Sequence, residues 1–451
     1  MPLPPWRRNQ IAVTVAACLI FGGFTLVMPF LPYYVEEVGI RGKAVDVWSG
    51  VLLSVSPLLA ALMAPLWGRL ADRYGMKIMV QRTILAMVIH WVLMGFATQI
   101  GHLLALRIFL GIFSGFATMS VALVTLGAPK ELTGRIIGAL QSAQILAAAA
   151  GPFIGGILYG SIGFRPTCFV TAIVCLLGFV LISFAYDDRE VRAGAEAPRP
   201  YATFADEGRS TDGPPGRAAP AGARGSEAGN GLADPLETPL TYWEIVRLPG
   251  FAAIALVLFS ATVISRSFGL IAPLYVKELA FGSTSLGFIA GLTVSGGSFA
   301  EAVSAWVQGR LCSRMLPRFL LFSGLALASV AVLPMMLARS AAPFMALRIL
   351  QGLVAGGTLT LGYTIGGAII PHASRATCFG ILSSAAMLGG ACGPVLAGLV
   401  SAAVGMRWVF VASCIGYSAL TLLVLGGLRR EIEPAPPPTE PYERPYIPVP
   451  R

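Results

Sequence analysis

A single carboxylate lies well inside an apolar run of this sequence. Glu301 occurs in the stretch SFAEAVSAW. A low-dielectric environment disfavours the charged form of a carboxylate, so a group in this position can bind and release a proton near neutral pH. Glu301 is therefore a candidate site for proton coupling or cation binding. A structural hydrogen bond is the alternative interpretation.

Three arginines also lie inside apolar runs. Arg107 and Arg348 occupy equivalent places in LRIFLGIFSG and LRILQGLVAG, and Arg266 occurs in SRSF. A charge inside a bilayer costs at least ~2.5 kcal/mol on insertion scales, so each should face the protein interior or an aqueous cavity. They could position a proton carrier or an anionic substrate group, or they could be structural arginines bonded to carbonyl groups.

Residue counting along the predicted spans separates these charges by depth. Glu301 lies near the inner end of its run and Arg266 near the outer end of its own, roughly 15 Å apart along the membrane normal. A direct ion pair between them is therefore not expected. Arg266 and Arg348 come out at similar depth and should make the outer cavity positive.

The composition identifies the elements that must hold these residues. Of the 451 residues, 56% are hydrophobic and 12% are charged, and the mean hydropathy is +0.75, which is typical of a polytopic membrane protein. A bilayer core about 30 Å thick needs about 20 apolar residues in helical form. Twelve such runs are predicted, at residues 10–32, 47–67, 78–99, 103–126, 136–160, 164–185, 249–272, 284–308, 319–338, 341–364, 377–403 and 407–428.

Internal repeats show that the chain is a duplicated unit. At an offset of 241, GRLADRYGMK (68–77) returns in part as GRLCSR (309–314), and PYYVEEVG (32–39) returns as PLYVKELA (273–280). GPFIGG (151–156) returns as GPVLAG at an offset of 242. Parallel repeats of six spans are typical of transporters. The predicted fold class is an all-α polytopic membrane protein with twelve transmembrane helices in two six-helix halves.

Four regions are predicted along the chain. Residues 1–186 should form an N-terminal six-helix bundle and residues 249–430 a C-terminal one. Residues 187–248, rich in Ala, Gly and Pro, should form a disordered cytoplasmic linker with a short interfacial helix at its end. Residues 431–451 should form a proline-rich cytoplasmic tail. Basic residues gather in the loops on the same side as the termini, which predicts an inner-membrane protein with both termini cytoplasmic.

GRLADRYGMK resembles the loop signature of the major facilitator superfamily between spans two and three. The matching residues are Gly68, Asp72, Arg73, Gly75 and Lys77. The glycines allow tight turns, and the resemblance implies that Asp72 accepts hydrogen bonds at the N-terminus of span eleven, where the helix dipole is positive. Arg73 is expected to pair with Glu131. Such a latch would favour the outward-facing state, and a purely topological role of these charges is the alternative.

GALQSAQILAAAAGPFIGG resembles the span-five signature of proton-driven antiporters. The matching residues are Gly138, Gly151, Pro152, Gly155 and Gly156, and the second half repeats the pattern at Gly393 and Pro394. Small residues permit close helix approach and proline bends a helix, which suits a hinge between the halves. Plain packing is the alternative. The resemblance implies export, although Ala147 replaces one expected glycine.

Taken over nearly the whole chain, stretches such as LPYYVEEVGI and GFRPTCFVTA resemble bacterial twelve-span drug:proton antiporters of the MdtG-like and quinolone-efflux type. This resemblance implies a secondary transporter that exports small amphipathic compounds in exchange for protons. Several relatives carry an acid in span one, whereas residues 10–32 contain none. Glu301 is therefore a hypothesis for the coupling site and not a residue transferred from the family.

Other classes of function are less well supported. A facilitator of the same fold could move a sugar or an organic anion, and a non-transporting receptor or lipid-handling protein is the alternative from another class. The sequence contains no P-loop, hydrolase motif or metal-ligand spacing among its seven cysteines, so we expect no enzyme activity, cofactor or metal. The net charge of +10 is located in membrane-flanking loops, so the expected partners are the lipid bilayer, the substrate and protons, without nucleic acid. A monomer would suffice.

Overall fold

The computed structural model describes residues 4–126, 132–186, 242–248, 250–280, 285–312, 314–369 and 375–427. Within these residues, twelve helical segments are long and apolar enough to cross a membrane. The predicted all-α, twelve-span fold is thereby confirmed. The predicted linker and tail lie outside the described residues, apart from a short helix, α10 (Tyr242–Arg247), where the interfacial helix was expected.

The first six spans are formed by eight helices and one 3₁₀ turn. They are α1 (Pro5–Val27), η1 (Met28–Phe30), α2 (Leu31–Glu37), α3 (Ala44–Tyr74), α4 (Met76–Phe96), α5 (Ile100–Phe113), α6 (Phe116–Thr125), α7 (Thr133–Ile162) and α8 (Phe164–Ala185). The last six spans are α11 (Phe251–Leu279), α12 (Leu286–Leu311), α13 (Pro317–Val332) with η3 (Leu333–Leu337), α14 (Ala341–Ala355), α15 (Thr358–Ile369), α16 (Arg375–Val404) and α17 (Met406–Gly427).

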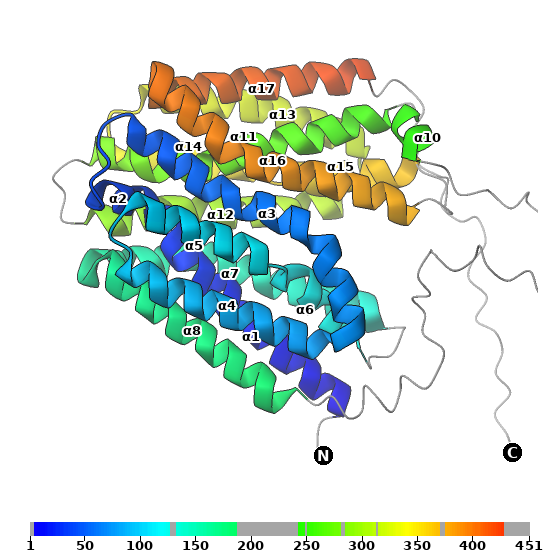
Figure 1. Cartoon of the computed structure of the whole chain (residues 1–451). Coiled ribbons are helices and arrows are strands. Elements are labelled where there is room, and N and C mark those ends of the chain that lie inside the picture. The colour runs from blue at the N-terminus through cyan, green and yellow to red at the C-terminus, as the bar shows by residue number, and fades with distance from the viewer. Residues whose placement is uncertain are drawn as a thin grey trace, which may run out of the picture.

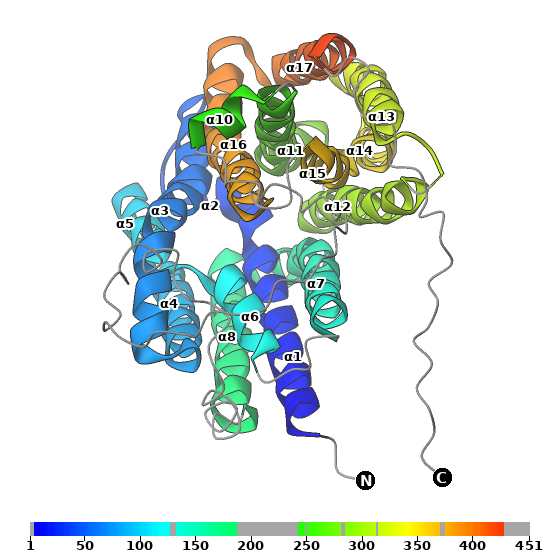
Figure 2. The same ribbon diagram turned by 90° about the vertical axis from the view of Figure 1, so that its right-hand side faces the viewer.

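The spans run side by side between two ends of the bundle (Figure 1). The terminal end is the end where α1 begins at Pro5, and the loop end is the end where α2 stops at Glu37 and α3 starts at Ala44. The two halves meet along two seams, α3 against α16 and α7 against α12, which Figure 2 shows from the terminal end.

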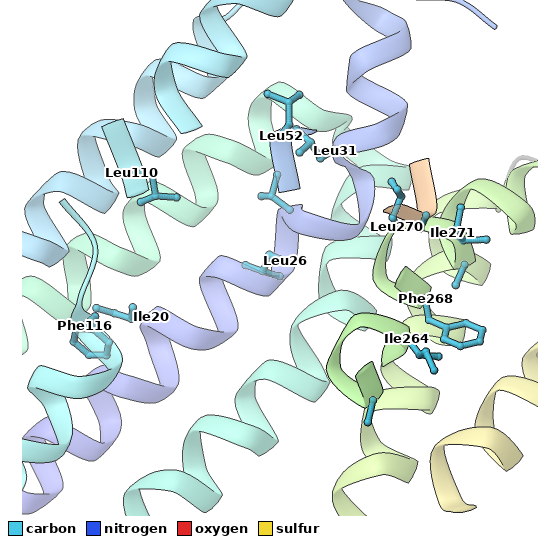
Figure 3. Packing of buried hydrophobic residues seen from close by; sticks show 14 of the residues in the cluster. Ile20, Leu26, Leu31, Leu52, Leu110, Phe116, Ile264, Phe268, Leu270 and Ile271 are labelled. Carbon is cyan, nitrogen blue, oxygen red and sulfur yellow. The ribbon is translucent and has the colours of Figure 1, made fainter. Parts of the chain in front are cut away.

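The duplication visible in the sequence reappears as repeated contacts. The Tyr34 hydroxyl donates a hydrogen bond to the Ala97 carbonyl, and the Tyr275 hydroxyl donates to the Ala338 carbonyl over 3.2 Å. Both donor and acceptor are shifted by the 241-residue offset. Buried aliphatic and aromatic side chains fill the interior of each half; Figure 3 shows Ile20 and Leu26 on the first span and Ile264 and Phe268 on α11. The repeat in the sequence therefore recurs in this contact between equivalent residues of the two halves.

Span four is broken, although the sequence predicts one continuous helix at 103–126. Gly115 has φ of +132°, a conformation that side-chain-bearing residues rarely adopt, and it separates α5 from α6. The break frees carbonyl groups, which must find partners in a lipid environment. The Trp67 indole N–H donates to the Ile112 carbonyl over 2.6 Å, and the Arg82 guanidinium donates to the Phe113 carbonyl over 3.3 Å.

Span ten is broken at the equivalent place. Helix α14 ends at Ala355 and α15 begins at Thr358, so the interruption falls at a Gly-Gly pair instead of one continuous helix over 341–364. The Gln308 side-chain amide donates to the Val354 carbonyl over 3.3 Å. Gln308 is the counterpart of Trp67 at the 241-residue offset. Each half thus uses a side chain of its second span to bond a carbonyl freed in its fourth.

Replacing Trp67 by Phe is expected to destabilise the protein by about 1–3 kcal/mol, because the partly buried Ile112 carbonyl at the helix break loses its donor. Thermal unfolding in detergent measures the effect. Trp306→Phe is the matched control, because the Trp306 side chain is 59% exposed. Equal losses of stability in the two variants would contradict the role of the indole N–H.

Candidate functional site

Glu301 forms an ion pair with Arg348. The Arg348 Nη2 lies 2.8 Å from the Glu301 Oε1, and the two side chains are 6% and 28% exposed, respectively. The pair joins α12 to α14, two helices that approach closely because glycines line their contact. A Cβ atom on Gly297 would lie 2.7 Å from the Arg348 Cζ, and one on Gly352 would lie 2.6 Å from the Gly297 carbonyl oxygen.

This pairing depends on side-chain reach, which residue counting along the backbone does not include. Counting placed Arg348 at the level of Arg266, far from Glu301, because it located the α-carbons and left out the length of the arginine side chain. The glycine contacts have the same spacing as the first residues of the two helices, Leu286 and Ala341: Gly352 packs against Gly297, and Gly356 packs against Glu301 itself. Arg348 precedes Gly352 by about one turn, so its long side chain reaches Glu301.

Arg266 does not take part in the pair. Its side chain is exposed and lies beside α16, where the Arg266 Cβ would be 3.0 Å from a Cβ on Gly393. Among the described residues, the ion pair of Glu301 is made with Arg348 and not with Arg266. Arg348 is 5% exposed and bonded to Glu301, so the positive outer cavity expected from Arg266 and Arg348 stays a prediction.

Arg107 occupies the equivalent place in the first half without a carboxylate. It is 1% exposed, and its Nη2 lies 3.1 Å from the Met28 sulfur. Within the described part of the chain its Nε has no partner. The position corresponding to Glu301 is Ala60. The first half therefore carries a buried cation where the second half carries an ion pair.

His90 is a buried packing residue next to this cation. Its side chain is completely buried, and its Nδ1 lies 3.0 Å from the Leu106 carbonyl oxygen. The ring contacts Trp91 edge-on. This arrangement agrees with a hydrogen-bonded histidine between α4 and α5.

The predicted gating residues surround the junction of α3 and α4. Gly75 turns the chain there, with φ of +94°. Gly68 does not form a turn, contrary to the expectation, because α3 continues to Tyr74. Lys77 donates to the Tyr186 carbonyl over 2.8 Å, and Arg73 is exposed. Glu131 and the side chain of Asp72 lie outside what the structure describes, so the latch stays a prediction.

The predicted hinge residues on α7 face two different helices. A Cβ on Gly151 or Gly155 would collide with α1, at Thr25 and Leu26 respectively. Gly156 faces Gly287 of α12, and the Pro152 carbonyl faces Gly291. Gly138 is the exception, because a Cβ there would have no neighbour within 4 Å. One side of α7 thus packs within its own half and the other forms the seam with the second half.

The repeat of this motif packs the other seam. Gly393 lies against the Val263 carbonyl of α11, at 2.5 Å from a built Cβ, and the Pro394 carbonyl lies 2.5 Å from a Cβ on Gly50 of α3. Such distances leave no room for a side chain. Both seams therefore depend on direct backbone contact.

At the loop end, polar contacts that the sequence analysis missed join the halves. The Tyr33 hydroxyl donates to the Pro273 carbonyl over 2.5 Å, and Lys277 pairs with Glu36. The Ser401 hydroxyl donates to Asp46 over 2.5 Å. Glu36 and Lys277 are counterparts at the 241-residue offset. Opposite charges at equivalent repeat positions were the available signal, because residues near a pseudo-two-fold axis meet their own counterparts.

A cleft of about 560 Å³ opens at this loop end, between the halves. Its lining includes Glu36, Asp46, Lys277, Glu278 and Arg407. With Lys43, which also lines the cleft, acidic and basic side chains are equal in number, which favours neither charge. The described residues contain no cluster of metal-ligating side chains.

The Glu36 and Lys277 pair should contribute little to holding the ends together. Both side chains are about a third exposed, at 36% and 29%, and exposed pairs contribute about 0.2–1 kcal/mol. A double-mutant cycle of Glu36→Gln and Lys277→Gln measures the coupling energy between the two side chains. The readout is the population of the closed loop end, obtained from spin-label distances. A coupling several times larger would show that the pair is a main element of closure.

Comparison with known proteins assigns the family. A model described as Major Facilitator Superfamily matches residues 13–343 and 290–450. The chain is 33% identical over 419 residues to the multidrug resistance protein MdtG of Yersinia enterocolitica, which covers 91% of this chain and 90% of that protein. It is 32% identical over 410 residues to MdtG of a Rahnella species, with 90% of each chain covered.

A solved structure has the same fold. It is a bacterial homologue of the human lysosomal transporter Spinster in an inward-facing and occupied conformation, with a TM-score of 0.74 and 17% identity. The match covers 96% of this chain and 100% of that one. With the helical architecture, the repeats and the sequence relatives all in agreement, the chain belongs to the Major Facilitator Superfamily and is a secondary membrane transporter of small molecules, not an enzyme.

Proposed function

We propose that the protein exports amphipathic compounds in exchange for protons by alternating access. The observation that carries this proposal is the ion pair of Glu301 and Arg348. A partly exposed carboxylate at membrane depth, bonded to a buried arginine, is a group whose charge a proton can cancel. The names of the relatives, multidrug resistance proteins, support the choice of amphipathic compounds as substrates.

The protein is proposed to lie in the inner membrane, with its terminal end facing the cytoplasm. Basic residues such as Arg69, Arg73 and Arg314 support this orientation, because the first two lie in the last turns of α3 and the third follows α12, both at the terminal end. The joined loop end is then external, which makes this conformation inward-facing. The span-five pattern, whose glycines form a seam between the halves, supports export as the direction.

In this mechanism, Glu301 takes up a proton when the protein opens outward and releases it inside. Protonation cancels the charge that attracts Arg348, so the two protonation states favour different arrangements of α12 and α14. The proposed hinge at Gly151, Pro152, Gly155 and Gly156 and the proposed latch at Asp72 would act on the two ends. A monomer suffices for this cycle.

The test is transport by the purified protein in proteoliposomes. An imposed pH gradient, acidic on the external side of the protein, should drive amphipathic dyes against their concentration gradient, and dissipating the gradient should stop it. Indifference of dye flux to the pH gradient across a broad panel would overturn the proposal.

A second candidate is a facilitator for organic anions, favoured by the buried Arg107 without a carboxylate partner among the described residues. A cation in that position could attract an anionic group of a substrate. Entry of radiolabelled organic anions into proteoliposomes down their concentration gradient, with no dependence on pH, would support this candidate over proton exchange.

A further inference from the structure

The guanidinium group of Arg348 is held from two sides. Besides its bond to Glu301, its Nη1 donates to the Gln351 Oε1 over 2.5 Å. The Gln351 amide in turn donates to the Tyr417 hydroxyl over 3.0 Å. Gln351 is 1% exposed and Tyr417 is 2% exposed. A buried chain of hydrogen bonds thus runs from Glu301 on α12, through α14, to Tyr417 on α17.

The fold itself does not require this chain. At the offset of 241, Gln351 corresponds to Leu110, and at the offset of 242, which applies from span five onward, Tyr417 corresponds to Cys175. Arg107 nevertheless takes the same buried position as Arg348. The first half therefore builds the same helix bundle around the same arginine with neither polar partner, and the partners occur only in the half that contains Glu301.

We propose that Gln351 and Tyr417 are positioning residues that hold Arg348 so that a single N–H group faces Glu301. This inference rests on the proposed role of Glu301 as the proton site. Gln351 accepts a hydrogen bond from Nη1 while Nη2 bonds the carboxylate, so the guanidinium is held in an orientation that turns Nη1 toward Gln351, and the stronger two-bond geometry of arginine and carboxylate is disfavoured. The pair is weak enough to be opened by a proton, and Arg348 keeps a hydrogen-bond partner when it opens.

Few other charges act on Glu301. The elements packed against α12 are α7, α11, α14, α15 and η1. Their titratable residues are Arg135, Tyr159, Arg266, Tyr275, Lys277, Glu278, Arg348 and Tyr363. Within the described part of the chain, Arg348 is the member of this set at ion-pair distance from Glu301. The geometry of the Arg348 side chain is therefore the main local control over the proton.

The test follows the carbonyl stretch of protonated Glu301 by infrared difference spectroscopy, identified as the band that Glu301→Gln lacks. In Gln351→Leu, which installs the residue of the first half, Arg348 is free to form both bonds to the carboxylate. The pH midpoint of the band should then fall by about one unit, as one additional charge-assisted hydrogen bond implies. Tyr417→Phe keeps the ring volume and should give a smaller shift in the same direction.

Ser329→Ala is the matched control, because Ser329 bonds Ser418 of the same helix α17 over 2.7 Å without contacting Arg348. It should leave the midpoint unchanged. A wild-type midpoint in both Gln351→Leu and Tyr417→Phe would overturn the positioning role. A shifted band combined with normal pH-driven transport in Glu301→Gln would instead keep the positioning role and remove Glu301 from the proposed transport cycle.

Discussion

Glu301→Gln is expected to reduce pH-gradient-driven transport to the level of protein-free liposomes while leaving substrate binding intact. Glutamine has the size of glutamate, and its side-chain oxygen still accepts the hydrogen bond from the Arg348 Nη2 that spans 2.8 Å in the wild type. It cannot exchange a proton. The variant therefore separates the packing role of residue 301 from its proton chemistry, and the readouts are uphill dye uptake and dye binding by fluorescence.

Glu301→Asp is the control for this prediction, because it retains the carboxyl group with a shorter reach. Partial transport is expected, with a changed pH optimum. If Glu301→Gln responds to the pH gradient as the wild type does, the proton site lies elsewhere. His90 would then be the next residue to replace, because it is a buried titratable group beside Arg107.

Gly156→Leu is expected to drive the α7 and α12 seam apart. A Cβ at this position would meet the Gly287 carbonyl, and it would lie 3.1 Å from the Gly291 Cα, so backbone would have to move. Overpacking of this kind costs about 1–3 kcal/mol, and a cost of that size changes a conformational population roughly 5- to 150-fold. The population with a closed loop end should fall relative to the open one by this factor, and transport should fall accordingly.

Spin-label distances between Arg41→Cys and Arg339→Cys, both at exposed positions of the loop end, report this population after the seven native cysteines are replaced. Gly138→Leu is the matched control on the same helix, because a Cβ at Gly138 has open space around it. A distance distribution in Gly156→Leu equal to that of Gly138→Leu would show that the seam tolerates a side chain.

The sequence predicts the number of spans, the two halves and the residues at membrane depth, because each depends on local hydropathy or on the repeat. It does not predict that Arg348 meets Glu301. Depth counted along the backbone locates α-carbons only, whereas the long side chain of Arg348 carries its guanidinium along the neighbouring helix to Gly297, one turn before Glu301. The sequence also does not predict that Gly68 is helical. A charged, glycine-containing stretch resembles a loop, yet α3 extends through it to Tyr74.

The interruptions of spans four and ten have a mechanical consequence. Carbonyls near each break bond to side chains of another span, Trp67 and Arg82 in one half and Gln308 in the other. Each of these spans is therefore two helices joined at a short break. Helices α6 and α15 can change their tilt without loss of the backbone hydrogen bonds inside either helix. The space between the halves at the terminal end can then change by a tilt of two short helices while the glycine seams at the opposite end stay in contact.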